Sequence, residues 1–380
     1  MQRMLLVAGL LVPGALTAQA DPGYRVGVVS ESGDIVTWIR PGNGTLTQDR
    51  VVPVGIMPAD IDGPHNLAVS PDNKFYYISI AHGTPFGSLW KMDARGDSLV
   101  GRAPLEMFPT TIGLIPDGEL AFVANSDFHG DHPRMNVVTV VHTPTMTTIT
   151  HLPACDMPHG VKSNHAGTLV YISCMNSDEL LEIEVATLRV GRRAKTGIGH
   201  DMNAMAGMDH GAMNHGAPAP AGQASAPAAS PAGGDGSCAP TFVSVSPDDK
   251  TLYAACNHGN SLQVWDAASL TRVKEIPLGA GAYNVEPSLD GKWVIVTNKK
   301  DRSFSLVDAQ SLTEVARIPT TKKIVHGVAW SPDGRYAFIS QESIGADPGA
   351  VDMLDLSTRK IVATISVPAQ PTGIAIWRSR

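Results

Sequence analysis

Short alternating runs of apolar and polar residues, separated by turns, recur along the chain and predict β-strands. One unit starts with the strand 64–69, turns at Ser70-Pro71-Asp72 and returns through 75–79. The same strand, turn and strand recur at 110–125, 159–174, 241–256, 283–298 and 326–341, and a lone first strand follows at 371–377. The pattern therefore predicts a protein built from repeated β-hairpins.

The first position of each repeat is here called its anchor. The anchors are His65, Thr110, His159, Thr241, Tyr283, His326 and Thr372. They follow one another at 45, 49, 82, 42, 43 and 46 residues, and the long interval becomes ordinary if about forty residues are an insertion. A second turn opens 25 residues after three anchors, at Glu184, Asp266 and Asp308. This spacing gives four strands per repeat, which is the blade of a β-propeller.

The two ends of the chain complete one another. Residues 25–54 offer three strands without a first strand, whereas 371–377 is a first strand without partners. Joining them leaves no open sheet edge. We therefore predict an all-β, seven-bladed β-propeller whose ring is closed when the C-terminal strand joins the N-terminal strands.

Two repeat motifs carry a family resemblance. A Ser-Leu-Asp-Gly turn at 288–291, a variant of the Ser-Pro-Asp turn, is followed by Val-Ile-Val-Thr-Asn at 294–298, and Phe-Val-Ala-Asn occurs at 122–125. These motifs resemble the YVTN family of β-propeller repeats over nearly the whole chain outside the insertion. The resemblance implies the fold but leaves the function open, because such propellers act as enzymes, cofactor carriers and binding platforms.

The first twenty residues have the layout of a secretory signal peptide. Arg3 precedes the apolar run 4–16, and Ala18-Gln19-Ala20 forms an A-x-A cleavage site. We therefore expect a periplasmic protein, and we expect it to be a monomer. We expect no membrane span, because no later stretch reaches eighteen apolar residues. The predicted division is a signal peptide at 1–20, propeller at 21–194, an insertion at 195–237 and propeller at 238–380. A formal net charge of -7 argues against nucleic acid as a partner.

Most histidines map to one face of the predicted ring, which we call the mouth. Inner strands begin there and second strands end there, so ten of the 13 His fall on this face. Across the hairpins, His159 is expected opposite Cys174, and Thr241 opposite Cys256. The four Cys also map there, either as soft metal ligands or as two disulfides. The disulfides could lie within hairpins, as 155–174 and 238–256, or between blades, as 155–238 and 174–256.

The insertion contains an unusual concentration of Met and His. Its ligand candidates are His200, Met202, Met205, Met208, His210, Met213 and His215. Thioether and imidazole together suit copper, since Met binds Cu(I) and His binds either oxidation state. The segment 208–213 resembles the Met/His-rich segments of periplasmic copper-handling proteins.

These residues lead to a hypothesis of copper handling, tolerance or delivery. The Met/His arm would capture Cu(I) or Cu(II), and a firmer site at the mouth would receive it. The ligand candidates at the mouth are His65, His159, Cys174, His258 and His326. A periplasmic protein would exchange the metal, and nothing in this scheme requires catalysis.

Alternative functions remain open at this stage. Some related propellers hold haem at this mouth through an axial His, as in the nitrite-reductase type, although the chain has no C-x-x-C-H motif for covalent haem. A copper-dependent oxidoreductase would need a paired-His signature that is missing. A lactonase-type hydrolase would use carboxylates and Ca²⁺, for which Glu286 and Glu342 are the nearest candidates.

Overall fold

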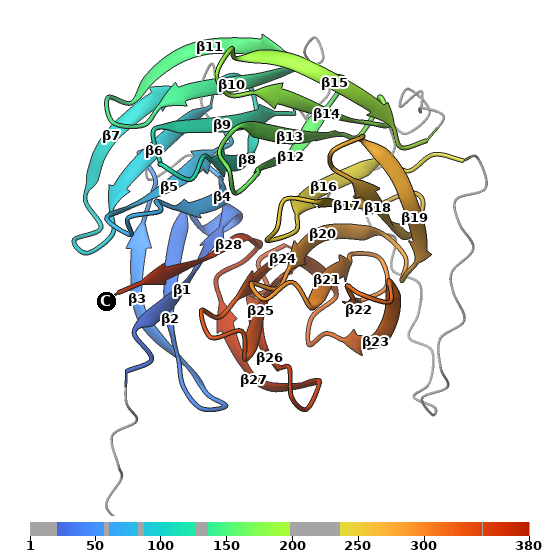
Figure 1. Ribbon diagram of the computed structural model, residues 1–380. Helices are drawn as coiled ribbons and strands as arrows, with labels where there is room; N and C mark the ends of the chain where they lie inside the picture. Colours follow the sequence, from blue (N-terminus) through green and yellow to red (C-terminus); the bar gives the residue numbers. More distant parts are fainter. Residues whose placement is uncertain are drawn as a thin grey trace, which may run out of the picture.

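The computed structural model describes residues 21–56, 61–82, 87–126, 136–197, 236–343 and 345–379. The predicted signal peptide and the Met/His arm lie outside these residues. Seven four-stranded antiparallel sheets are arranged as blades around a central axis (Figure 1). The prediction of an all-β, seven-bladed propeller is therefore confirmed. Within the described ranges, no helix has the length and apolar character needed to cross a membrane.

We number the blades from the first complete one, and give their strands from the inner to the outer edge. Blade 1 consists of β4 (Pro64–Val69), β5 (Phe75–Ile80), β6 (Ser88–Asp93) and β7 (Leu99–Pro104). Blade 2 consists of β8 (Pro109–Leu114), β9 (Leu120–Asn125), β10 (Val137–His142) and β11 (Thr147–Pro153). Blade 3 consists of β12 (Pro158–Ser163), β13 (Leu169–Cys174), β14 (Glu179–Glu184) and β15 (Arg189–Lys195). Blade 4 consists of β16 (Pro240–Val245), β17 (Thr251–Cys256), β18 (Ser261–Asp266) and β19 (Thr271–Pro277). Blade 5 consists of β20 (Ala282–Pro287), β21 (Trp293–Asn298), β22 (Ser303–Asp308) and β23 (Thr313–Pro319). Blade 6 consists of β24 (Ile324–Trp330), β25 (Tyr336–Glu342), β26 (Gly349–Asp355) and β27 (Lys360–Val367).

Blade 7 combines both ends of the chain, as the sequence predicts. Its order is β28 (Pro371–Arg378), β1 (Tyr24–Ser30), β2 (Ile35–Pro41) and β3 (Leu46–Pro53). Figure 1 shows β28 in red beside β1 in blue. A short 3₁₀ helix, η1 (Glu31–Gly33), follows β1 directly and brings the chain to the mouth.

The Ser-Pro-Asp motif forms the turn between the two inner strands because its polar side chains satisfy the local backbone. In blade 1, the hydroxyl of Ser70 donates to Asp72 Oδ1 at 2.6 Å and accepts the amide of Phe75 at 3.0 Å. The same Ser–Asp bond measures 2.6 to 2.7 Å in blades 4, 5 and 6, although Leu289 replaces the proline in blade 5. The motif thus starts the second strand at the same point in each of these repeats.

Each anchor coincides with a β-bulge in the inner hairpin. In blade 3, Val161 pairs with Ile172, the register that the sequence predicts, but Pro158 rather than His159 lies opposite Cys174. A bulge inserts an extra residue and changes the direction of its side chain. The register shifts at the anchors of the other blades lie between Pro64 and Asn66, Pro109 and Ile112, Pro240 and Phe242, Ala282 and Val285, Val325 and Val328, and, on the strand paired with β28, Val28 and Ser30.

The expected partner of Cys256 needs the same one-residue correction. Pro240 lies opposite Cys256, whereas Thr241 is the bulged residue and Phe242 resumes the ladder opposite Ala255. The bulge causes this one-residue shift in pairing. The alternation of apolar and polar residues along a strand does not reveal a bulge, so the sequence pattern could not predict the shift.

A belt of hydroxyl groups fixes the anchors and joins all seven blades. Each hydroxyl donates to the carbonyl of the next anchor: Ser79 to Thr110 (2.8 Å), Thr110 to His159 (3.3 Å), Ser173 to Thr241 (2.8 Å), Thr241 to Tyr283 (2.6 Å), Thr297 to His326 (3.0 Å), Ser340 to Thr372 (2.6 Å) and Thr372 to His65 (2.7 Å). The anchor backbones are thereby held by neighbouring blades.

Candidate functional site

The mouth is lined by anchor side chains that pack against one another. The ring centroids of Tyr283 and His326 are 4.8 Å apart, those of His65 and His326 are 5.8 Å apart, and those of His159 and Tyr283 are 5.6 Å apart. Phe242 packs edge-on to His159 at 5.0 Å. All five side chains are buried. The structure therefore brings three of the predicted metal ligands, His65, His159 and His326, into one cluster.

A buried carboxylate holds His65 in one orientation. Glu31 Oε2 lies 2.8 Å from His65 Nδ1, and Glu31 Oε1 lies 3.1 Å from His82 Nε2. Burial opposes the ionisation of Glu31, but the two imidazoles outweigh it through charge and hydrogen bonding and lower the pKa of this carboxyl well below its usual value. Because an ionised carboxylate only accepts hydrogen bonds, His65 Nδ1 is the donor in this contact, and in the neutral form of the ring Nε2 then carries the lone pair. Among the described residues, none has a hydrogen bond to His65 Nε2.

His159 is oriented by the backbone of the next blade. Its Nδ1 lies 2.9 Å from the carbonyl oxygen of Thr241, so this nitrogen carries the proton. Its Nε2 accepts from the hydroxyl of Tyr283 at 3.3 Å. Burial raises the pKa of Tyr283 to about 12, which keeps the hydroxyl protonated as a donor.

A buried ion pair lies beside the same cluster. Lys299 Nζ is 2.9 Å from Glu342 Oε1 and 4.3 Å from the centre of the Tyr283 ring. Burial opposes the charged form of Lys299, but Glu342 raises the pKa of this amine above its usual value. His326 Nε2 lies 3.7 Å from the same carboxylate oxygen. The cluster thus contains one cation close to the aromatic rings.

The structure removes Cys174 from the predicted ligand set. Cys174 is bonded to Cys155, and Cys238 is bonded to Cys256, so both disulfides lie within hairpins. A sulfur in a disulfide is not a thiolate, and the thiolate is the metal-binding form. Among the described residues, one group of three possible metal donors lies within 4.8 Å, namely Cys155, Cys174 and Glu179. Two of these three form the disulfide and therefore offer no thiolate.

His258 lies apart from the anchors, in the loop between β17 and β18. Its amide donates to the carbonyl of Cys238 at 3.0 Å, so the structure places it over the second disulfide. The acidic residues considered for a hydrolase are engaged in ion pairs. Glu286 contacts Lys162 at 2.7 Å, and Glu342 contacts Lys299.

The two ends of the insertion meet beside blade 4. The carboxylate of the buried Asp178 accepts the amides of Cys238 at 3.1 Å and Ala239 at 2.5 Å. A Cβ atom on Gly197 would lie 2.8 Å from the carbonyl oxygen of Gly236. The proposed copper ligands of the arm, His200 to His215, lie outside the described residues.

Sequence reasoning missed several residues of the site. Glu31 was overlooked because the second strand of blade 7 lies at the N-terminus, far from its own anchor in sequence. Lys299 occupies the equivalent position, directly after the second strand of blade 5, whereas His82, one of the ten histidines assigned to the mouth, lies one residue further along in blade 1. Applying that position to all seven repeats would have found Glu31 and Lys299. Phe242 could not be identified in this way, because an apolar residue after an anchor is expected to pack in the hydrophobic core.

Comparisons with known proteins agree with the propeller fold. The family model of the cytochrome D1 heme domain matches residues 240–327, which comprise blades 4 and 5 and the start of β24. Among solved structures, hydrazine synthase of Kuenenia stuttgartiensis is similar at 20% identity and a TM-score of 0.60, covering 80% of this chain and 79% of that one.

Two further structures are similar over most of the chain. A functionally unknown protein from Desulfotomaculum acetoxidans DSM 771 has 12% identity and a TM-score of 0.69, with coverage of 94% and 99%. The dihydro-heme d1 dehydrogenase NirN in complex with DHE has 15% identity and a TM-score of 0.57, with coverage of 97% and 78%. At these identities the likeness establishes the fold alone.

Proposed function

We propose that the protein binds an iron tetrapyrrole at the mouth of its propeller, where His65 would hold the iron. The observation that carries this proposal is the state of the His65 ring. Glu31 holds its Nδ1 at 2.8 Å and leaves the lone pair of Nε2 open. Histidines that bind metals usually donate their other ring N–H to a carboxylate or a carbonyl, which is the arrangement at His65.

The donor set fits a tetrapyrrole better than a chelated bare ion. The anchor imidazoles of His65, His159 and His326 are presented by three different blades, and the ring centroids of His65 and His326 are 5.8 Å apart. A tetrapyrrole brings four nitrogen ligands of its own, so the protein needs to supply only one or two. Phe108 and Phe242 add aromatic surface beside the histidines. When bound, the iron would supply electron transfer and the binding of small ligands.

The comparisons support this reading over a copper carrier. The matched family model is that of a haem domain, and it spans residues 240–327, which include Tyr283, Lys299 and His326. NirN is similar in fold, and its structure is a complex with DHE. We further propose that the protein acts in the periplasm and exchanges its ligand or electrons with another periplasmic protein.

Titration of the purified protein with haemin tests the proposal. We expect saturable binding of one haemin per chain, with the absorption spectrum of histidine-ligated iron. His65→Ala should lose that spectrum. His165→Ala is the matched control, because His165 is exposed and contacts Asp249 in the turn far from the mouth. If the wild type binds no haemin, or if the spectrum and affinity of His65→Ala match those of the wild type, the proposal is wrong.

Copper handling remains a second candidate for the same protein. It is favoured by the four imidazoles near the mouth, His65, His82, His159 and His326, together with the Met/His content of residues 200–215. A copper titration of the wild type and of a chain lacking 199–216 distinguishes the two candidates. Copper carriage predicts a lower copper stoichiometry after the deletion, whereas equal stoichiometry with intact haemin binding rejects it.

A further inference from the structure

We infer that Glu31 is a positioning residue that tunes the metal-binding character of His65, with His82 holding the carboxylate in place. This inference rests on the proposed function, because it concerns the same site. It goes beyond that function by assigning the redox behaviour of the bound iron to two residues from different blades. Neither residue needs to touch the tetrapyrrole.

The geometry uses both oxygens of the carboxylate. Glu31 Oε2 contacts His65 Nδ1 at 2.8 Å, and Glu31 Oε1 contacts His82 Nε2 at 3.1 Å. The side chain of Glu31 is only 7% exposed, whereas that of His82 is 32% exposed. Two partners on a buried carboxylate fix its orientation, so His65 has little freedom to rotate away from Glu31.

The main-chain environment fixes the same pair. Glu31 is the first residue of η1, which follows β1 of blade 7, whereas His65 is the anchor of blade 1. The carbonyl of His65 accepts from the hydroxyl of Thr372, which is the anchor of blade 7, at 2.7 Å. Both the ring and the backbone of His65 are therefore held by the blade that closes the propeller.

A carboxylate on Nδ1 changes the imidazole as a ligand. By accepting a hydrogen bond from Nδ1–H, the carboxylate increases the electron density of the ring and raises the basicity of Nε2. A more basic axial ligand stabilises ferric iron more than ferrous iron, which lowers the reduction potential. Glu31→Gln keeps the size of the side chain but removes the negative charge, so it should raise the potential.

His82 acts one step further from the metal. His82→Ala leaves Glu31 and its contact with His65 in place but removes the bond that holds the other oxygen. We expect a shift in the same direction as Glu31→Gln and smaller in size. Because His82 is partly exposed, this variant also limits the risk that the substitution disrupts folding.

The decisive experiment is a redox titration of the haemin-loaded chain. Glu31→Gln should favour ferrous iron by at least about tenfold, which corresponds to a rise of about 59 mV, and should weaken haemin binding by about 10- to 100-fold. Glu182→Gln is the matched control, because Glu182 is also a buried carboxylate but is paired with Arg192 in blade 3. It should leave both quantities unchanged.

A measurement without haemin separates this inference from the proposed function. Nitrogen NMR of the apo protein should find the proton of His65 on Nδ1 in the wild type, and Glu31→Gln should shift or broaden that signal. A proton on Nε2 in the wild type, or a potential for Glu31→Gln equal to that of Glu182→Gln, overturns the inference while haemin binding stands. If the wild type binds no haemin, the proposed function and the redox tuning both fall, and the NMR result alone reports on the role of Glu31 in orienting His65.

Discussion

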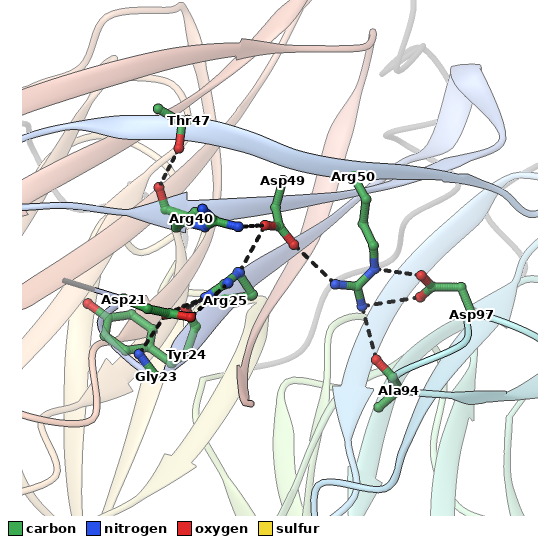
Figure 2. A network of polar contacts seen from close by, with 10 residues as sticks. All are labelled: Asp21, Gly23, Tyr24, Arg25, Arg40, Thr47, Asp49, Arg50, Ala94 and Asp97. Carbon is green, nitrogen blue, oxygen red and sulfur yellow. Dashed lines mark hydrogen bonds and ion pairs between the residues drawn. The ribbon is translucent and has the colours of Figure 1, made fainter. Parts of the chain in front are cut away.

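Arg50 connects the closing blade to blade 1, and its replacement offers a direct test of how the ring is held shut. Its guanidinium donates to Asp97 through Nε at 2.5 Å and to the carbonyl of Ala94 at 3.0 Å (Figure 2). It also lies 5.0 Å from the ring centre of Trp38 and 5.0 Å from that of Trp377. Since Trp377 comes from β28 and Trp38 from β2, one side chain joins three separate parts of the sequence.

The size of the effect follows from these contacts. Each partly desolvated cation–π contact contributes about 1 kcal/mol. The ion pair with Asp97 is partly exposed, with 25% and 16% of the two side chains accessible, so after solvent screening it adds about 1 kcal/mol together with the carbonyl bond. Arg50→Ala should therefore lower the free energy of unfolding by about 3 kcal/mol. Arg50→Lys keeps the charge but loses the planar fork, and should cost about 1 to 2 kcal/mol.

Urea unfolding followed by circular dichroism measures this change. Arg95→Ala serves as the control, because Arg95 is exposed in the turn between β6 and β7, and it should change the stability by less than about 0.5 kcal/mol. Equal dependence on urea concentration for all variants would show that the same surface unfolds in each. If the free energies of unfolding of Arg50→Ala and Arg95→Ala agree within about 0.5 kcal/mol, the contacts of Arg50 do not stabilise the closed ring and the reasoning is wrong.

Three other substitutions follow from the same structure. Replacing Cys155 and Cys174 by Ser should lower the free energy of unfolding by about 3 kcal/mol, because their disulfide closes a separation of 19 residues, and a thiol titration of the denatured wild type should find no free thiol. Burial raises the pKa of Tyr283 to about 12, against about 10 in the unfolded chain, so the resulting stabilisation is complete below pH 10 and is lost as the pH rises towards 12. Tyr283→Phe should reduce the alkaline loss of stability in urea unfolding curves without abolishing it, because burial also raises the pKa of Tyr24, Tyr76 and Tyr171, and a curve that still falls as in the wild type contradicts it. Gly160→Ala should cost about 1 to 3 kcal/mol in the same assay, since its Cβ would lie 2.7 Å from the backbone Cα of Phe242, and an unchanged midpoint would refute this clash.

The repeats could be read from the sequence because each blade solves the same local problem. A Ser-Pro-Asp turn between two apolar strands leaves little choice of partner, and the incomplete strand sets at the two ends of the chain leave only one way to close the ring. The bulges could not be read, because one extra residue changes neither the turn nor the alternation below it. The pairing of Cys155 with Cys174 stayed open because all four Cys map to the same face, where pairings within hairpins and between blades are both compatible with the repeat pattern.

The candidate site was only partly predictable for a different reason. Anchors such as His65 stand at a repeated position, so their meeting at the mouth follows from the fold. Glu31 contacts His65 across 34 residues of sequence, and only the closed ring brings the two together. The position of Glu31 recurs among the repeats, but its contact with His65 does not follow from that position, so the sequence predicted His65 as a candidate and not the group that orients it.

The closing blade and the candidate ligand form one mechanical unit. Thr372 from the C-terminal strand holds the carbonyl of His65, while Glu31, next to the N-terminal strand, holds its ring. A separation of the two chain ends would therefore remove contacts that hold both the ring and the backbone of His65. A ligand that binds His65 only in this orientation would stabilise the closed ring. By thermodynamic linkage, closure of the ring would strengthen the binding of that ligand by the same free energy. The contact between the two ends of the chain is thus where closure of the ring and the proposed ligand binding would be coupled most directly.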